Sequence, residues 1–168
     1  MFNLLKIKFQ DMVTIKKLCT DAEQYALKRN EKTPGAEHFL LAALDLEEGS
    51  AKRIFKNLGV NSDDFNAAIT KQYANALEKL GFSQVAVDDV KNQTEQKPTS
   101  VIYQAKASAH FLMQSLANRK DKNIPLQGAH ILEVISNMQD GVAIRGLRAM
   151  DVDLSNFRQV VLKELNAK

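Results

Sequence analysis

Cysteine, glycine and proline are scarce in this chain of 168 residues, and tryptophan is absent. Cys19 is the only cysteine, so a scaffold built on disulfides within the chain is excluded. Seven glycines and three prolines are too few for a collagen-like or low-complexity protein. No apolar run approaches the roughly 18 residues of a spanning helix, and the first residues lack the apolar core of a secretory signal. These absences predict a soluble protein without a membrane partner, which we expect to be cytoplasmic.

The charge balance gives no strong indication of a partner. The 23 basic and 20 acidic residues leave a net charge of +3, and no nucleic-acid-binding motif occurs, so we expect no nucleic acid as partner. Hydrophobic residues make up 45% of the chain, and a protein of this length buries roughly 70% of its unfolded surface. We therefore predict one folded domain over residues 1–168.

Most of the chain follows the helical period of 3.6 residues rather than the period of two that is typical of strands. One such stripe consists of Ile15, Leu18, Ala22, Tyr25 and Ala26. Similar stripes recur down the chain and are separated by turn-forming residues, such as Gly59 after the third predicted helix. Ser62 is the predicted cap of the next helix. The pattern predicts an all-α fold.

The second half of the chain repeats the first. Residues 92 positions apart match, as in the pairs His38/His130, Gly49/Gly141 and Phe65/Phe157, and the offset is 91 at Pro34/Pro125. We predict two four-helix repeats, over about 10–82 and about 101–167, joined by a polar linker at about 83–100. Because one repeat alone would leave apolar surface uncovered, the two should pack together about a pseudo-twofold axis.

The matching segments resemble a known family. The run PGAEHFLLAAL at residues 34–44 resembles the G-T-E-H-L-L-L-A-L segment of the Clp N-terminal repeat, and residues 48–60 are similar to the next segment of that repeat. The second copy matches more weakly, at 128–132 and 140–143. The resemblance covers about residues 10–167. It implies the all-helical, double-repeat N-terminal domain of the Clp (Hsp100) unfoldases, which binds adaptors and substrates and relays them to an ATP-driven ring.

The ATP-driven motor of that family has no counterpart here. No G-x-x-x-x-G-K-[ST] segment occurs, so we expect the chain neither to bind nor to hydrolyse ATP. The motifs HExxH, GxSxG and CxxC are absent too. We therefore expect the chain to have no enzymatic activity and to bind no cofactor and no metal. The resemblance implies a binding module, free-standing or part of a larger unfoldase, whose partners are a Clp-type AAA+ ATPase, an adaptor or a substrate protein. The alternative is a recognition module of a secretion or assembly complex, because some Clp relatives of type VI secretion grip a sheath helix with a similar domain.

Glu37 is the residue that the resemblance singles out for ligand binding. In the family's copies that recognise phosphorylated arginine, the Glu of each T-E-H motif binds the guanidinium, and a carboxylate suits that planar group. Here Ala36 replaces the Thr of the first copy, while Gly128 and Ala129 replace Thr and Glu in the second. The alternative for Glu37 is a structural position in the first turn of its helix. We predict a peptide-binding groove between the repeats that includes Lys32, Thr33, Ala36, Glu37, Gly128 and Ala129.

Other conspicuous residues have structural explanations. His38 and His130 are expected to be hydrogen-bonded near the starts of their helices, His110 to lie at the surface or core edge, and Cys19 to be a small core residue. The basic clusters at 28–32 and 119–122 each end the first helix of a repeat, where cations complement the helix dipole, or else form an edge for an acidic partner. The apolar residues of the segment 1–12 either pack on the body or offer a strand or helix to a partner.

Overall fold

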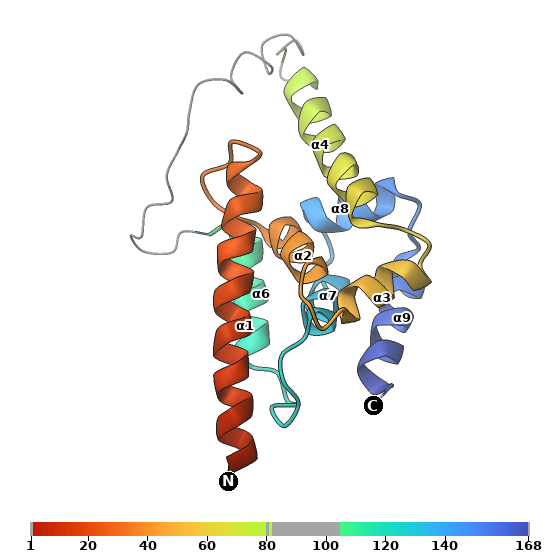
Figure 1. Ribbon diagram of the computed structural model, residues 1–168. Coiled ribbons are helices and arrows are strands. Elements are labelled where there is room, and N and C mark those ends of the chain that lie inside the picture. Colours follow the sequence, from red (N-terminus) through yellow and green to blue (C-terminus); the bar gives the residue numbers. More distant parts are fainter. Residues whose placement is uncertain (1, 80, 82–104, 168) are drawn as a thin grey trace.

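The computed structural model describes residues 2–79, 81 and 105–167. These residues form eight helices and no strand, which confirms the predicted all-α fold. The helices of the first half are α1 (Phe2–Leu27), α2 (Ala36–Leu44), α3 (Ser50–Asn57) and α4 (Ser62–Lys79) (Figure 1). Those of the second half are α6 (Ala107–Ala117), α7 (Gly128–Ser136), α8 (Val142–Ala149) and α9 (Leu154–Asn166). The predicted linker at 83–100 lies outside the described residues.

Helices of the two halves pack in equivalent pairs. α1 packs on α2 as α6 packs on α7, and α4 packs on α8 as α9 packs on α3. The corresponding helices α2 and α7 pack against each other. This exchange of partners is what two four-helix repeats related by a pseudo-twofold axis produce. One cluster of buried apolar side chains includes residues from all eight described helices. The residue boundaries of the domain and of its two repeats stay predictions.

The helix boundaries follow the local sequence, with one difference. Gly59 adopts the left-handed conformation (φ +72°) after α3, as predicted for a glycine that ends a helix. The predicted cap of α4 was wrong by one residue. Asn61, not Ser62, caps the helix, because its Oδ1 accepts a hydrogen bond from the Asp64 N–H at 2.9 Å.

The N-terminal segment, for which the sequence left packing on the body or a strand or helix for a partner open, is helical. Residues 2–12 form the beginning of α1, because no glycine or proline interrupts the chain before Pro34. As a result α1 has 26 residues, whereas its counterpart α6 has 11. Figure 1 shows the N-terminal part of α1 extending beyond the end of α6. Among the described helices, α1 included, none has the length and apolar character to cross a membrane.

Candidate ligand-binding site at the start of α2

The six residues of the predicted peptide-binding groove occupy two places, the start of α2 and the start of α7. On the loop before α2, Lys32 is exposed and Thr33 is half-buried. The other four lie in the first turns of α2 and α7 and are buried, namely Ala36, Glu37, Gly128 and Ala129. In this structure the loop is therefore accessible to a ligand, whereas Glu37 is buried.

Glu37 lies among polar side chains that come from distant parts of the chain. Its Oε1 accepts hydrogen bonds from the Tyr73 hydroxyl on α4, at 3.1 Å, and from the Lys106 ammonium group, at 3.0 Å. Lys106, which immediately precedes α6, also donates to the Glu31 carboxylate and to the Tyr73 hydroxyl. The Glu37 side chain is 1% exposed and that of Lys106 is 34% exposed, so a cation of the second half covers a carboxylate of the first.

The charges of this cluster follow from its contacts. Burial by itself would raise the pKa of Glu31, but interactions with His38 and Lys106 lower that pKa to about 2. Burial by itself would lower the pKa of Lys106, but its bonds to the carboxylates and to Tyr73 raise that pKa. Burial raises the pKa of Tyr73 to about 12. At neutral pH, therefore, Glu31 is ionised, Lys106 is protonated and Tyr73 is neutral.

His38 connects the cluster to the helix start. Its Nδ1 accepts a hydrogen bond from the Gly35 N–H at 2.9 Å, so in the neutral ring the proton is on Nε2. That Nε2 lies 3.4 Å from Oε1 of Glu31. The prediction of a histidine that is hydrogen-bonded at the start of its helix is confirmed.

The same arrangement recurs at α7. Nδ1 of His130 accepts a hydrogen bond from the Gln127 N–H at 3.0 Å, and Nε2 lies 2.9 Å from Oδ2 of Asp121. Burial by itself would raise the pKa of Asp121, but the interaction with His130 lowers it. His130 is therefore structural too, as predicted.

Glu31, Glu37 and His38 also have the proximity of metal ligands, since each offers one ligand atom within 4.8 Å of the others. Their bonding does not suit a metal ion. Both carboxylates already bind the Lys106 ammonium, and His38 has one nitrogen that accepts from Gly35 and one that carries the proton. In this cluster the Lys106 ammonium group occupies the place that a bound cation would take between the two carboxylates.

The start of α7 is closed by groups from the first half. The Gly128 N–H donates to Oε1 of Glu48 at 2.6 Å, and the Ala129 N–H donates to Oγ of Ser50 at 2.8 Å. A Cβ on Gly128 would lie 2.8 Å from Cβ of Ala51, which leaves no room for the family's threonine. The amides that a second ligand would use are therefore already bonded.

The arginines of the two basic clusters are hydrogen-bonded to other parts of the chain. Arg29 donates to the Asn66 carbonyl oxygen at 3.0 Å, just after the end of α1. Arg119, just after α6, donates to Oδ2 of Asp11 at 2.7 Å. His110 is exposed, as predicted, and Cys19 is half-buried and packs against the core.

Comparison with protein families identifies this chain's relatives. A family model described as the Clp repeat (R) N-terminal domain matches residues 13–117, more than half of the chain. No curated protein matches the chain. The matched range includes Glu31, Glu37, Tyr73 and Lys106, whereas residues 2–12 of α1 precede it.

Proposed function

Because the chain belongs to the Clp repeat N-terminal domain family, we propose that it is a non-catalytic module that binds adaptor or substrate proteins for a Clp-type AAA+ unfoldase in the cytoplasm. The family match over residues 13–117 is the observation that carries this proposal. The exchanged helix pairs of the two halves support it, since they fit the family's double-repeat fold.

The loop before α2 is the part of the proposed binding surface that a partner meets first. Lys32 is exposed there and has no ion pair with any other described residue. In the first turn of α2, the buried Glu37 is bonded to Lys106. We therefore propose that partners contact the loop around Lys32 and Thr33, and that Glu37 becomes available only if Lys106 leaves it.

Capture of partners by the tagged 168-residue chain in its native host tests this function. We expect a Clp-type ATPase or its adaptor to be recovered, and the variant Lys32→Glu to recover less of it. Lys52→Glu is the matched control, because Lys52 is an exposed lysine on α3, away from the loop. Recovery of sheath or other secretion components without any Clp protein would instead support the alternative, a recognition module of a secretion complex.

Phosphoarginine binding is expected to be weak or absent. The guanidinium would have to displace Lys106 from Glu37, and the second copy has Ala129 in place of a carboxylate. A hydrogen bond to a charged group contributes about 1.5–3 kcal/mol, so each lost pocket lowers affinity about tenfold to hundredfold. A substrate with two phosphoarginines would also have bound two linked sites with an avidity that one site lacks.

Calorimetric titration with free phosphoarginine checks this expectation. Any binding that remains should disappear in Glu37→Ala, whereas Glu78→Ala, which removes an exposed carboxylate near the end of α4, should not change it. Tight binding by the unmodified chain, or binding that Glu37→Ala leaves intact, would mean that the family's ligand site does not carry over as argued.

A further inference from the structure

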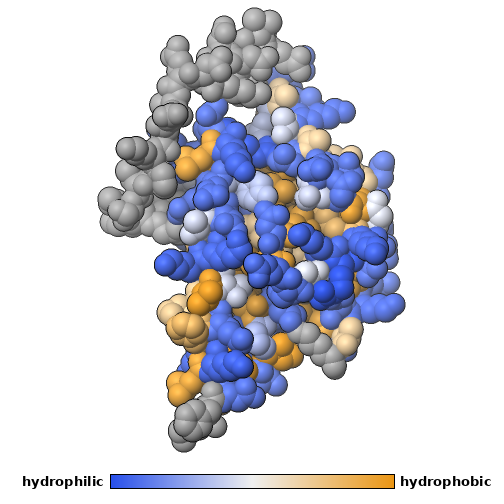
Figure 2. Space-filling model, viewed as in Figure 1, coloured by the Kyte–Doolittle hydropathy of each residue, from blue (hydrophilic) through white to orange (hydrophobic). Residues whose placement is uncertain are grey.

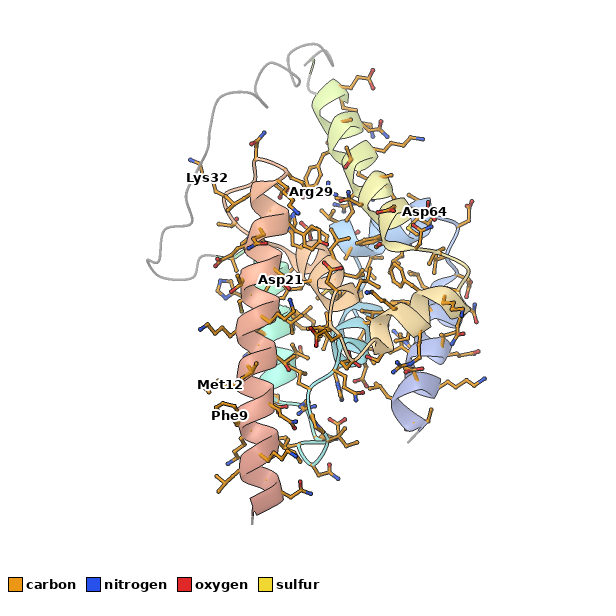
Figure 3. All side chains as sticks on the ribbon, viewed as in Figure 1. Phe9, Met12, Asp21, Arg29, Lys32 and Asp64 are labelled. Carbon is orange, nitrogen blue, oxygen red and sulfur yellow. The ribbon has the colours of Figure 1, made fainter. Side chains whose placement is uncertain are left out.

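Exposed apolar side chains gather at one place, the N-terminal part of α1. Seven large apolar side chains are exposed among the described residues, and five of them lie between residues 4 and 13. Leu5, Phe9 and Met12 are 62%, 63% and 59% exposed. Figure 2 shows apolar residues along this edge of the molecule, and Figure 3 shows Phe9 and Met12 on the side of α1 away from the other helices. Concentrated apolar exposure of this kind marks interaction surfaces.

These side chains form a second apolar face on α1, separate from the face that packs on the body. At about 100° per residue, Leu5, Phe9 and Met12 lie within about 60° of one another. Ile7 and Asp11 lie on about the opposite side. Ile7 is 6% exposed, and Asp11 accepts a hydrogen bond from the Leu126 N–H at 2.7 Å. We name the outward row Leu5, Phe9 and Met12 the α1 stripe.

The spacing of the α1 stripe matches one seam of a coiled coil. Steps of four and then three residues place Leu5, Phe9 and Met12 at successive d, a and d positions. Leu4 and Val13, each 52% exposed, extend the apolar face on both sides of the stripe, so its width does not identify the occupant. The d, a, d spacing of the stripe favours a partner helix.

The charges beside the stripe select the kind of helix. In the same register Lys6 is at e and Lys8 is at g, the positions that face a partner's charges, and both are exposed. Asp11 is the only acidic residue between 2 and 17, and it is bonded to Arg119. A second copy of this chain would bring no free acidic side chain against these lysines in either orientation. We propose that the α1 stripe docks an amphipathic helix of another protein that carries acidic residues at its e and g positions.

A pair of synthetic helical peptides of about 18 residues tests the proposal, both with leucine at a and d, one with glutamate and one with lysine at e and g. Titrated into the 168-residue chain, the glutamate peptide should bind at least about tenfold more tightly than the lysine peptide, with an affinity that falls as salt rises. The double variant Lys6→Glu/Lys8→Glu should reverse this preference. Equal binding of the two peptides, or no binding of either, overturns the proposal.

Matched variants locate the binding. Leu5→Lys and Phe9→Lys should each weaken the glutamate peptide at least about tenfold while thermal unfolding stays unchanged, because both side chains are exposed. Leu162→Lys makes the same exchange at an exposed leucine of α9 and should leave binding unchanged. Insensitivity to Phe9→Lys would overturn the proposal. So would tighter association with phosphatidylglycerol vesicles than with the peptide, or self-association through the stripe in sedimentation experiments.

Discussion

Replacing Lys106 by methionine is expected to lower the free energy of unfolding by about 3 kcal/mol. Removing one partner of a buried ion pair costs about 3–5 kcal/mol because the other charge stays buried, and the lower end applies since Lys106 is 34% exposed. The charge left behind is that of Glu37, which is 1% exposed. Urea unfolding at pH 7 of the wild-type chain and the variant measures the difference.

A double-mutant cycle separates the ion pair from other effects of the substitution. Glu37→Gln removes the buried charge, so the double variant Lys106→Met/Glu37→Gln should be more stable than Lys106→Met alone. Lys32→Met is the matched control at an exposed lysine and should change stability by less than about 0.5 kcal/mol. If Lys106→Met were as stable as Lys32→Met, or if the cycle showed no coupling, Lys106 would not be stabilising Glu37.

The same cluster is expected to make stability depend on acid pH. The pKa of Glu31 is lowered from 4.5 to about 2 in the folded chain, so its contribution is present above pH 4.5 and is lost as the pH falls towards 2. In Lys106→Met this loss should be smaller, because one of the groups that lower the pKa is gone. Urea unfolding between pH 2 and pH 6 checks the slope, and parallel curves for the two proteins would contradict this account.

Restoring the family's glutamate in the second copy, Ala129→Glu, is expected to destabilise the chain by at least about 3 kcal/mol rather than to create a second ligand site. Ala129 is 0% exposed, and the neighbouring Gly128 N–H is already bonded to the Glu48 carboxylate. With the offset of 91 residues, Ile15 stands at the position equivalent to Lys106, so no lysine is supplied from there.

Ala129→Gln is the matched control for this prediction, because it adds a side chain of the same size without the charge. It should be less destabilising at pH 7, and the difference between the two variants should shrink at acid pH, since a buried carboxyl group is neutral there. Thermal or urea unfolding at both pH values gives the comparison. Equal stability of the two variants at pH 7, or phosphoarginine binding by Ala129→Glu, would contradict the prediction.

The elements of this fold were predictable where the signal is local. Most of the apolar run from His38 to Leu46 forms the buried helix α2, which ends at Leu44. His38 and His130, found as a matching pair, do occupy equivalent positions at helix starts. Turn residues such as Gly59 also ended helices where expected. Hydrophobic period and glycine conformation act over a few residues, so they can be recognised in a sequence.

The partners of Glu37 were not predictable in the same way. Tyr73 and Lys106 are 36 and 69 residues away along the chain, and no periodic signal connects them with it. The motif left Glu37 as either a ligand-binding carboxylate or a structural residue in the first turn of its helix, and neither alternative included the ammonium group that the packing of the halves places on it. The start of α1 was missed for a different reason, because Leu5, Ile7 and Phe9 alternate with lysines and this short run has no unambiguous period.

Each half supplies a hydrogen-bond acceptor to a backbone N–H at a helix start of the other half. The Ala36 N–H at the start of α2 donates to Oγ of Ser108 at 3.1 Å, and the Ala129 N–H at the start of α7 donates to Oγ of Ser50 at 2.8 Å. A fragment that contained one half alone would lose these acceptors together with its apolar partner surface. Each half therefore completes the hydrogen bonding at a helix start of the other half, so substitution of Ser50 or Ser108 is expected to weaken a helix of the opposite half.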